Sequence, residues 1–439
     1  MNKHITKLLS ASVVACLLPI SAFSQSADKV SPSIEAVYQT LSKQEVVKKS
    51  LEDLKKDEDR ALQELIVVTE IPSPPFKEEK RAEYSLKRFK ELGLSNAYID
   101  KEGNVIAVRK GSGNGPTLVI AAHIDSVFKE GTNVTVTKKG DEYFGAGVTD
   151  NARGVTTMFS MLKIMQDNKI KTKGDVIFVA NVGEEGEGDL RGMKAFFRDN
   201  KNVDGFLAID SSVEGGIVNT AVGSHRYEII FKGTGGHSYG HFGQVLNPIH
   251  AMGRAIDKIS DIQVPKDPKT TFFVTIVSGG TSVNAIPDVA TMKVDMRSSD
   301  MKELLALEKQ ILDAIDKGVE EENKRWDTEV KLTVEKKMIG DRPAGSVTTD
   351  APIVQAAVAS LAQLGIEPKF ASSSTDSNVP VSLGIPSITI SKGGISKGAH
   401  SLKESYIHKN AYLAAQNALL LTLGLVGLDG VTEPVLTKK

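Results

Sequence analysis

The sequence has a single cysteine and no excess of either charge among its 439 residues. One cysteine, Cys16, excludes an intrachain disulfide. Lys and Arg number 54 and Asp and Glu number 55, so the chain lacks the basic excess that is typical of nucleic-acid-binding proteins. Repeats and low-complexity stretches are also absent. What remains is ordinary globular composition, with 40% hydrophobic and 25% charged residues.

Residues 1–24 have the features of a cleaved signal peptide. A positive start is followed by an apolar run, and small residues at Ala22 and Ser24 are the type that signal peptidase recognises. Cys16 leaves a lipoprotein as the less favoured alternative, because the residues after it are apolar where a lipoprotein tether is usually polar. We therefore expect a periplasmic or secreted product without cysteine and without a cysteine-based metal site.

Apolar strands and helical segments alternate along most of the chain. Residues 34–70 have the apolar spacing of a helix, and strands and helices then alternate from residue 105 to residue 209. This alternation predicts an α/β fold with a mostly parallel sheet and helices on both faces. The Leu- and Ala-rich residues 411–428 are interrupted by glycines and amides, which predicts a packed C-terminal helix and no membrane span.

A different order of elements interrupts this pattern after Gly223. We expect four strands and two helices in the order β-α-β-β-α-β, at residues 227–231, 247–260, 271–277, 289–297, 301–325 and 329–335. This is the split βαβ, or ferredoxin-like, layout. We therefore expect a catalytic domain in two parts, 25–224 and 339–439, and an inserted α+β lid domain at 225–338.

Several predicted strands run directly into side chains that can bind a metal ion. These side chains are imidazoles and carboxylates, namely His123, Asp125, Glu184, Glu185, Asp210 and His400. Ligands of open α/β sheets bind beyond the carboxyl ends of the strands, so we expect these groups to meet in one crevice. Each of them alone has a plainer explanation, such as a helix cap, a turn or a surface histidine. Their combination favours a metal site.

Asp150 lies in a segment, residues 145–154, with glycines on both sides. Its plainer role is to cap the helix that follows. A carboxylate also has two oxygens and can bridge two metal ions about 3.5–4 Å apart, which an imidazole cannot do. Asp150 is therefore a candidate for a ligand that two metal ions share.

Together these motifs resemble one family. H-x-D, G-x-G-x-x-D-N-x-x-G, G-E-E-G, a later strand-end Asp and G-x-H-S occur in the order found in co-catalytic zinc metallopeptidases, which include peptidase T, glutamate carboxypeptidase, aminoacylase and succinyl-diaminopimelate desuccinylase. The resemblance covers nearly the whole chain after the leader, including the inserted lid. It implies a zinc exopeptidase-like fold, a homodimer formed through the lid, and two Zn²⁺ per subunit. The same ligands also accept Co²⁺ or Mn²⁺.

The resemblance divides the predicted ligands between the two ions, with one ligand shared. The two sets are His123, Asp150 and Asp210, and Asp150, Glu185 and His400. Asp125 would orient His123 by accepting its hydrogen bond, and Glu184 would be the general acid/base. Three carboxylate ligands and a bridging hydroxide also balance the four positive charges of two Zn²⁺ ions.

The lid contains further candidates. The resemblance implies that His237, with His241 as the less favoured neighbour, reaches the active site of the other subunit and stabilises an oxyanion there. It also assigns substrate contacts to Asn284 and Arg297, and a guanidinium suits a substrate carboxylate. The plainer alternatives are an exposed turn for the histidine and a surface ion pair for the arginine. Outside the lid, Asp376 either binds a substrate ammonium group or makes a turn, and the sequence does not separate these roles.

These expectations combine in an exported dizinc exopeptidase that hydrolyses amide bonds of short peptides, as a di-/tripeptidase or an aminopeptidase. A metal-bridged hydroxide would attack the scissile carbonyl while Glu184 transfers the proton to the leaving amine. The alternatives are an N-acyl-amino-acid amidohydrolase or carboxypeptidase of the same family, and a non-catalytic peptide-binding protein. The last is disfavoured because every family position holds a chemically competent residue.

Overall fold

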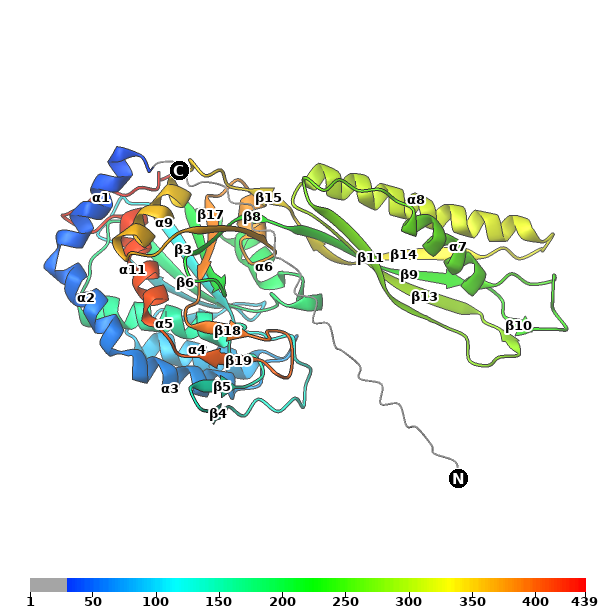
Figure 1. Ribbon diagram of the computed structural model, residues 1–439, viewed down its shortest axis with the longest axis horizontal. Coiled ribbons are helices and arrows are strands. Elements are labelled where there is room, and N and C mark those ends of the chain that lie inside the picture. Colours follow the sequence, from blue (N-terminus) through cyan, green and yellow to red (C-terminus); the bar gives the residue numbers. More distant parts are fainter. Residues whose placement is uncertain (1–29) are drawn as a thin grey trace, which may run out of the picture.

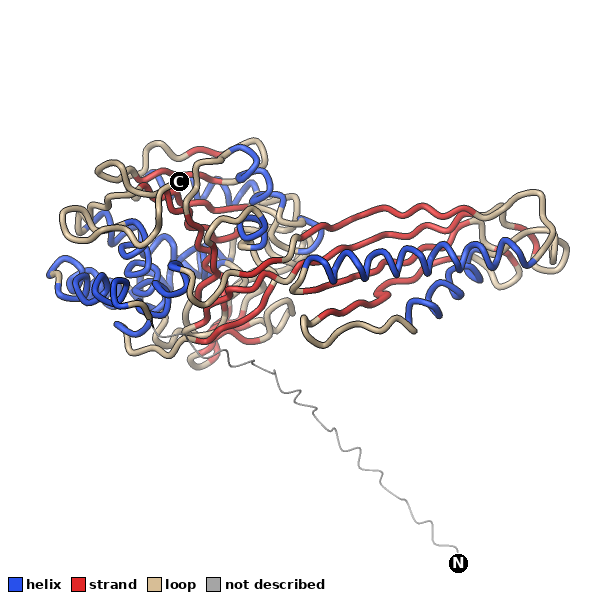
Figure 2. Tube along the Cα trace, turned by 90° about the horizontal axis from the view of Figure 1, so that it is seen from above, coloured by secondary structure: helices blue, strands red, loops and turns tan. Residues whose placement is uncertain are grey.

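The computed structural model describes residues 30–439, so the predicted signal peptide and Cys16 lie outside the described residues. The described chain forms a rounded body from which an elongated lid projects like an arm (Figure 1). Seen from above, the same two parts remain separate over most of the length of the lid (Figure 2). Between residues 30 and 439, no helix is long and apolar enough to cross a lipid bilayer.

A mixed sheet forms the centre of the body. Its strand order is β1-β2-β6-β3-β7-β17-β8-β15, and β16 also pairs with β8. The strands are β1 (Tyr98–Ile99), β2 (Val105–Arg109), β3 (Thr117–His123), β6 (Asp175–Asn181), β7 (Gly205–Ser211), β8 (Gly216–Ala221), β15 (Gly345–Ser346), β16 (Lys369–Ser373) and β17 (Ser387–Ser391). The four inner strands β6, β3, β7 and β17 are parallel, so their carboxyl ends lie along one edge of the sheet.

Successive residues of the inner strands pack against helices on opposite faces of the sheet. In β3, Leu118 and Ile120 belong to a larger core, whereas Val119 and Ala121 belong to a smaller one. The larger core is covered by α1 (Pro32–Lys43), α2 (Glu45–Lys56), α3 (Glu58–Thr69), α4 (Glu79–Glu91), α5 (Ala152–Asp167), α9 (Pro352–Gln363) and α11 (Tyr412–Val426). The smaller core is covered by α6 (Arg191–Asp199) and α10 (Asn378–Ser382). Burial on both faces explains the continuous apolar runs and confirms the predicted α/β fold.

The N-terminal helical segment is divided into α1, α2 and α3, whereas one helix was expected over residues 34–70. The chain leaves the helical conformation at Gln44, whose backbone is extended (φ −74°, ψ 130°), and again at Asp57. Because the chain turns at these points, α1 packs against α9 and α11, while α2 and α3 reach α5. The apolar spacing continues across both turns, so tertiary packing and not the local pattern sets the breaks.

The lid is a four-stranded antiparallel sheet with two helices on one face. The strand order is β11-β13-β9-β14, and the chain order is the predicted β-α-β-β-α-β. The elements are β9 (Gly223–Lys232), α7 (Pro248–Ser260), β11 (Thr270–Gly279), β13 (Val289–Ser298), α8 (Met301–Arg325) and β14 (Thr333–Arg342). Buried side chains of β9, β13, α7 and α8 form a hydrophobic core that belongs to the lid alone. A short pair, β10 (Gly236–His237) and β12 (Ala285–Ile286), lies at the end of the lid remote from the body (Figure 1).

The last lid strand runs much further toward the body than the expected 329–335. β14 pairs with β9 from Thr333 opposite Lys232 to Arg342 opposite Ser224. β9 likewise begins at Gly223, four residues before the strand expected there. These two strands connect the lid to the body, and their extra residues deliver side chains to the edge of the central sheet.

A second small sheet of the body holds the loop with His400. Its order is β18-β19-β5-β4, and its strands are β4 (Thr137–Lys139), β5 (Glu142–Phe144), β18 (Ile395–Lys397) and β19 (Ser405–Ile407). His400 lies between β18 and β19 with a positive φ of 64°. This loop is the last piece of the body needed to complete the site described next.

Candidate metal centre

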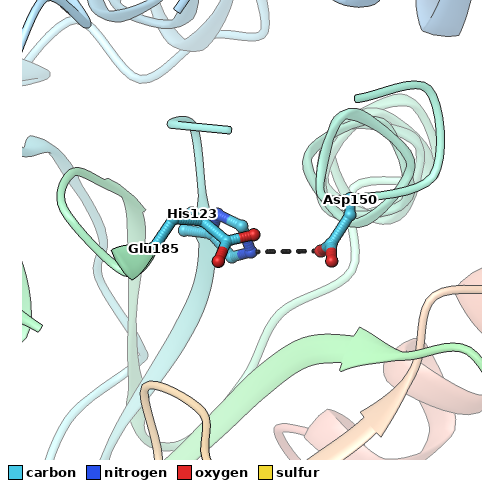
Figure 3. Close-up of side chains that lie close together, drawn as sticks. All are labelled: His123, Asp150 and Glu185. Carbon is cyan, nitrogen blue, oxygen red and sulfur yellow. Dashed lines mark ion pairs between the residues drawn. The ribbon is translucent and has the colours of Figure 1, made fainter. Parts of the chain in front are cut away.

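Ligands predicted from the strand ends converge at the carboxyl edge of the sheet. One atom each of His123, Asp150 and Glu185 lie within 4.8 Å of one another (Figure 3). His123 is the last residue of β3, and its Nε2 lies 3.4 Å from Asp150 Oδ1 and 3.8 Å from Oδ1 of Asp210 in β7. Glu185 follows β6, and Asp150 lies two residues before α5. Three neighbouring parallel strands and one helix start therefore build the cluster.

His400 reaches the same cluster from the opposite side. Its Nε2 lies 3.0 Å from Asp150 Oδ2 and 3.2 Å from Glu185 Oε1. Asp150 thus turns Oδ1 toward His123 and Oδ2 toward His400. The structure therefore brings all five predicted metal ligands together, with Asp150 in the middle.

Opposite charges stabilise the ionised carboxylates of this cluster. Burial opposes the charge of Asp150, but Lys392, His123 and His400 outweigh it and hold its pKa well below the usual range. Hydrogen bonds with Asp150 and Glu185 raise the pKa of His400 to about 10. Metal binding needs neutral imidazoles, so a bound ion would displace the extra ring protons of His123 and His400. The ion would then supply the positive charge that balances the carboxylates.

The side chains present fit a divalent metal ion. Two imidazoles and three carboxylates are the nitrogen and oxygen donors that Zn²⁺ accepts. His123 Nε2 is buried and has no hydrogen-bond partner among residues 30–439, although it points into the group of carboxylates (Figure 3). A buried ring nitrogen without a hydrogen bond is costly unless something else binds it, and its only ion-pair partners among the described residues are the carboxylates of Asp150 and Asp210.

Asp125 joins the ends of β3 and β6. It is fully buried and accepts hydrogen bonds from the backbone N–H groups of Glu184 (3.1 Å) and Glu185 (2.8 Å). His123 Nδ1 lies 3.2 Å from the backbone oxygen of Asp125 and 3.5 Å from its carboxylate Oδ1. Asp125 thus contacts His123 through its backbone oxygen and its carboxylate, and it also holds the backbone that carries both glutamates.

Glu184 lies buried next to the predicted ligand Glu185 and pairs with an arginine that sequence reasoning did not identify. Arg342 Nη1 donates to Glu184 Oε1 and to Ser374 Oγ, both at 3.1 Å, and Nη2 donates to the backbone oxygen of Glu184. Burial raises the pKa of Glu184 well above its usual range; the charge of Arg342 opposes this shift and Glu185 adds to it. A carboxyl with a raised pKa suits proton transfer near neutral pH.

Glu404 is a second residue that sequence reasoning missed. It is 1% exposed, and its carboxylate accepts hydrogen bonds from the backbone N–H groups of Gly147 (3.0 Å), Thr149 (2.7 Å) and Asp150 (3.0 Å). It therefore holds the loop that carries Asp150. The available signal was its position four residues after His400, in the same predicted metal-binding segment.

Lys392 is the third unpredicted residue. It is 2% exposed and its Nζ donates to Asp210 Oδ1 (2.9 Å) and to Asp150 Oδ1 (3.2 Å). It directly follows β17, so the strand-end rule that identified the ligands also applies to it. Its residue type hid it, because an ammonium group does not bind a metal ion.

The predicted lid residues His237 and Asn284 are placed away from this cluster. Both are exposed at the remote end of the lid, where His237 pairs with Ala285 across β10 and β12 (Figure 1). His237 Nδ1 accepts hydrogen bonds only from nearby backbone N–H groups, and His241 Nδ1 accepts one from the N–H of His237. Within one chain, the structure does not bring these residues to the metal ligands.

The two remaining candidates also differ in environment. Arg297 lies in β13 with 43% of its side chain exposed, and its Nε donates to Asp295 Oδ2 at 2.7 Å, so the ion pair considered as the plainer alternative is present. Asp376 is buried and accepts a hydrogen bond from Asn181 Nδ2 at 2.8 Å. Burial raises the pKa of Asp376 to about 7.

Comparison with known proteins adds a family and a fold. The sequence matches the profile described as Peptidase family M20/M25/M40 over residues 119–424. It is 36% identical over 137 residues to a relative from Pyrococcus abyssi, covering 30% of this chain and 35% of the relative. It is 28% identical over 207 residues to the N-acetylcysteine deacetylase of Bacillus subtilis, and the match covers 44% of this chain and 53% of that relative. The chain thus spans about a third and about half of the lengths of these curated relatives.

A solved structure agrees with the fold over nearly its whole length. The crystal structure of a tripeptidase from Staphylococcus aureus superimposes with a TM-score of 0.70 at 22% identity, covering 83% of this chain and 97% of the other. At this identity the likeness shows the shared fold.

Proposed function

The chain belongs to peptidase family M20/M25/M40, whose profile covers residues 119–424, and from this premise we propose that it is a metal-dependent hydrolase that cleaves amide bonds of short peptides. The observation that carries the proposal is the convergence of His123, Asp150 and Glu185 beside the buried Glu184. Metal ligands alone would suit a storage site, but an adjacent buried carboxyl outside the predicted ligand set suits proton transfer.

The proposed centre holds two divalent ions, with Zn²⁺ favoured by the donor set and Co²⁺ or Mn²⁺ as substitutes. The residues that would hold them are His123, Asp150 and Asp210 on one side, and Asp150, Glu185 and His400 on the other. When bound, such ions polarise a scissile carbonyl and make a water molecule more acidic.

The chain's own residues then move the protons. Glu184 accepts a proton from the attacking water and passes it to the departing amine. Arg342 contacts Oε1 of Glu184, which leaves Oε2 to receive that proton. Asp125 keeps Glu184 in place through the backbone N–H of Glu184 itself.

Two substrate classes fit this reaction. We propose short peptides with a free amino end, as for a di-/tripeptidase or an aminopeptidase, because the motifs resemble peptidase T and the fold matches a tripeptidase. The second candidate is an N-acyl-amino-acid amidohydrolase or carboxypeptidase, which the 28% identity to a deacetylase favours. Both reactions use the same proton transfers and differ in which end of the substrate is recognised.

A homodimer is part of this proposal, because the lid tip projects away from the body of its own chain (Figures 1 and 2). β11 is an edge strand of the lid sheet, and it exposes Phe273 (70%), Ile276 (54%) and Val277 (56%). An apolar edge strand is a template for pairing with another copy. Pairing of two lids along β11 would allow His237 and Asn284 of each chain to serve the site of the other.

We also propose that residues 1–24 direct export and are then removed. N-terminal sequencing of protein recovered from the periplasm or the medium is expected to begin at Gln25. A product that retains Met1, or that stays in the cytoplasm, contradicts this part of the proposal and leaves the catalytic part unaffected.

Metal removal and a matched substrate pair test the catalytic proposal. Protein stripped with a chelator is expected to lose peptide cleavage and to regain it with Zn²⁺, Co²⁺ or Mn²⁺. Dipeptides with a free amino end are expected to be cleaved faster than their N-acetylated counterparts, and the reverse preference would select the amidohydrolase. Cleavage that survives complete metal removal, or peptide binding without cleavage by the reloaded protein, contradicts the proposed hydrolase.

A further inference from the structure

Lys392 is the charged residue of the metal centre to which the proposed function gives no role. Its backbone is fixed, because its N–H donates to the Ser211 oxygen and its own oxygen accepts from Thr157 Oγ1, both at 2.8 Å. Its side chain is 2% exposed, so the ammonium group cannot turn away into solvent without moving β17. A positive charge is therefore built into the centre.

This charge acts on one side of the centre only. Lys392 Nζ binds Oδ1 of Asp210 and Oδ1 of Asp150, and these are the same two oxygens that face His123 Nε2. The other oxygen of Asp150, Oδ2, lies next to His400. An ion held by His123 would therefore share both of its carboxylate oxygens with Lys392, whereas an ion held by His400 would not.

The charges around the centre are unequally distributed between its two halves. Asp150, Glu185 and Asp210 contribute three negative charges, and the buried Asp125 beside His123 contributes a fourth. Lys392 returns one positive charge, and it does so at the two oxygens that face His123. Glu184 and Arg342 pair with each other. An ion held by His123 would therefore add two positive charges beside a buried ammonium group, whereas an ion held by His400 would not.

We propose that Lys392 makes the two halves of the metal centre unequal. The half formed by Asp150, Glu185 and His400 retains its ion, whereas the half formed by His123, Asp150 and Asp210 binds its ion weakly and exchangeably. This inference rests on the metal centre of the proposed function and specifies how that centre fills. Lys392 is in these terms a positioning residue that acts through the two aspartates.

Metal binding measured directly tests the inference without relying on activity. Chelator-stripped protein is titrated with Zn²⁺ by calorimetry against a competing chelator, and the metal retained after dialysis is counted by mass spectrometry. The wild-type protein is expected to retain one ion and to bind the second at least about tenfold more weakly, because of the added like charge. Lys392→Met is expected to retain two ions of similar affinity, while Lys392→Arg keeps the inequality.

Lys397→Met is the matched control, because Lys397 ends the next strand, β18, but is 53% exposed and pairs with Glu142. It is expected to bind Zn²⁺ as the wild type does. Two ions of equal affinity in the wild type, or an unchanged ratio in Lys392→Met, overturn the inference and leave the proposed hydrolase standing. A wild-type protein that binds no Zn²⁺ overturns both. If Lys392→Met fails to fold, as judged by circular dichroism, the ratio of the two Zn²⁺ affinities in the wild type and in Lys392→Arg still tests the inference.

Discussion

The strand-end cluster and the lid tip both hold predicted site residues, but they differ in how far their own chain completes them. At the strand ends, His123 and Glu185 are 1% and 6% exposed and lie among charged partners from four elements. At the lid tip, His237 and Asn284 are exposed, and the side-chain hydrogen bonds described for them come from near neighbours: His237 accepts from backbone N–H groups and Asn284 from Ser282 Oγ. Buried polar groups must be satisfied within the chain, whereas exposed groups at the end of an arm are free to meet another surface. The comparison teaches that one chain brings the first set together by itself and leaves the second set apart from it.

Removal of the proposed acid/base should abolish most of the activity that we assign to the strand-end cluster. Glu184→Gln is expected to lower kcat by about 10²–10⁴-fold, because the amide cannot carry the proton from water to amine. Because Glu184 is not among the ligands, the variant should retain the metal content of the wild type. Peptide turnover and metal content are measured on the same preparation.

The control for Glu184 lies three residues away. Glu187 is exposed and pairs with Lys293 of the lid at 3.3 Å, so Glu187→Gln should leave kcat close to the wild-type value. Full turnover by Glu184→Gln would remove this residue from its assigned role. Loss of metal in the same variant would instead make it a ligand.

Loss of the lid histidine should give the next largest effect. His237→Ala is expected to lower kcat by about 10²–10³-fold, the usual contribution of one oxyanion donor. Mixing it with Glu184→Gln sharpens the comparison, because a mixed dimer then has one site with both residues intact. Random mixing should restore roughly a quarter of wild-type activity if the twofold pair shares its sites.

The same mixture can also contradict the proposal that His237 serves the site of the partner chain. No recovery on mixing would place the role of His237 within its own chain or remove it altogether. His241→Ala serves as the matched variant, since His241 is exposed beside His237 and bonds its backbone N–H. It is expected to retain most of the wild-type activity.

The sequence pattern located candidate site residues at the ends of buried strands, but it did not locate the one at the end of an edge strand. β3, β6 and β7 are apolar on both faces, so their last residues stand out and point to His123, Glu185 and Asp210. β14 lies at the edge of the lid sheet and exposes Lys337 and other polar side chains, so its apolar pattern fades before it ends. The predicted strand stopped at 335, and this misplaced boundary hid Arg342.

A different limit explains the N-terminal helices and Lys392. Nothing in the spacing of residues 34–70 marks the turns at Gln44 and Asp57, because those turns are set by packing against α5, α9 and α11. Lys392 occupies a strand end like the ligands, but its contact with two aspartates depends on the neighbouring strand. Sequence patterns locate single strand ends; they do not supply the partner that the fold brings to each.

A change in the support of Asp150 should have an intermediate effect. Glu404→Gln removes a charge that three backbone N–H groups share and places an amide N–H among these donors. Metal affinity is expected to fall by about 10–100-fold, as is usual for groups that orient ligands. Titration with Zn²⁺ measures this, with the exposed Glu433→Gln as control. Unchanged affinity would show that the Asp150 loop holds its position without Glu404.

The smallest expected effect concerns the root of the lid, which links the two regions. His225 is 3% exposed in β9, and its Nδ1 lies 3.1 Å from Glu308 Oε2 and its Nε2 3.4 Å from Asp341 Oδ1. Burial works against the charged ring, but Asp341 and Glu308 outweigh it and raise the pKa of His225 above its usual value. The protonated ring therefore stabilises the folded state.

This stabilisation has a defined pH dependence. Because the folded pKa exceeds the unfolded value of about 6.5, it is fully present below that pH and is lost as the pH rises through the folded pKa. The Tm of the wild type should fall over this window, and hydrogen exchange in β9 and β14 should speed up, while His225→Gln shows a flatter profile. His250→Gln, at a lid histidine with 49% exposure, should follow the wild type. Parallel profiles for His225→Gln and the wild type would show that the lid root does not depend on this charge, and the connection between body and lid would then rest on the β9–β14 pairing alone.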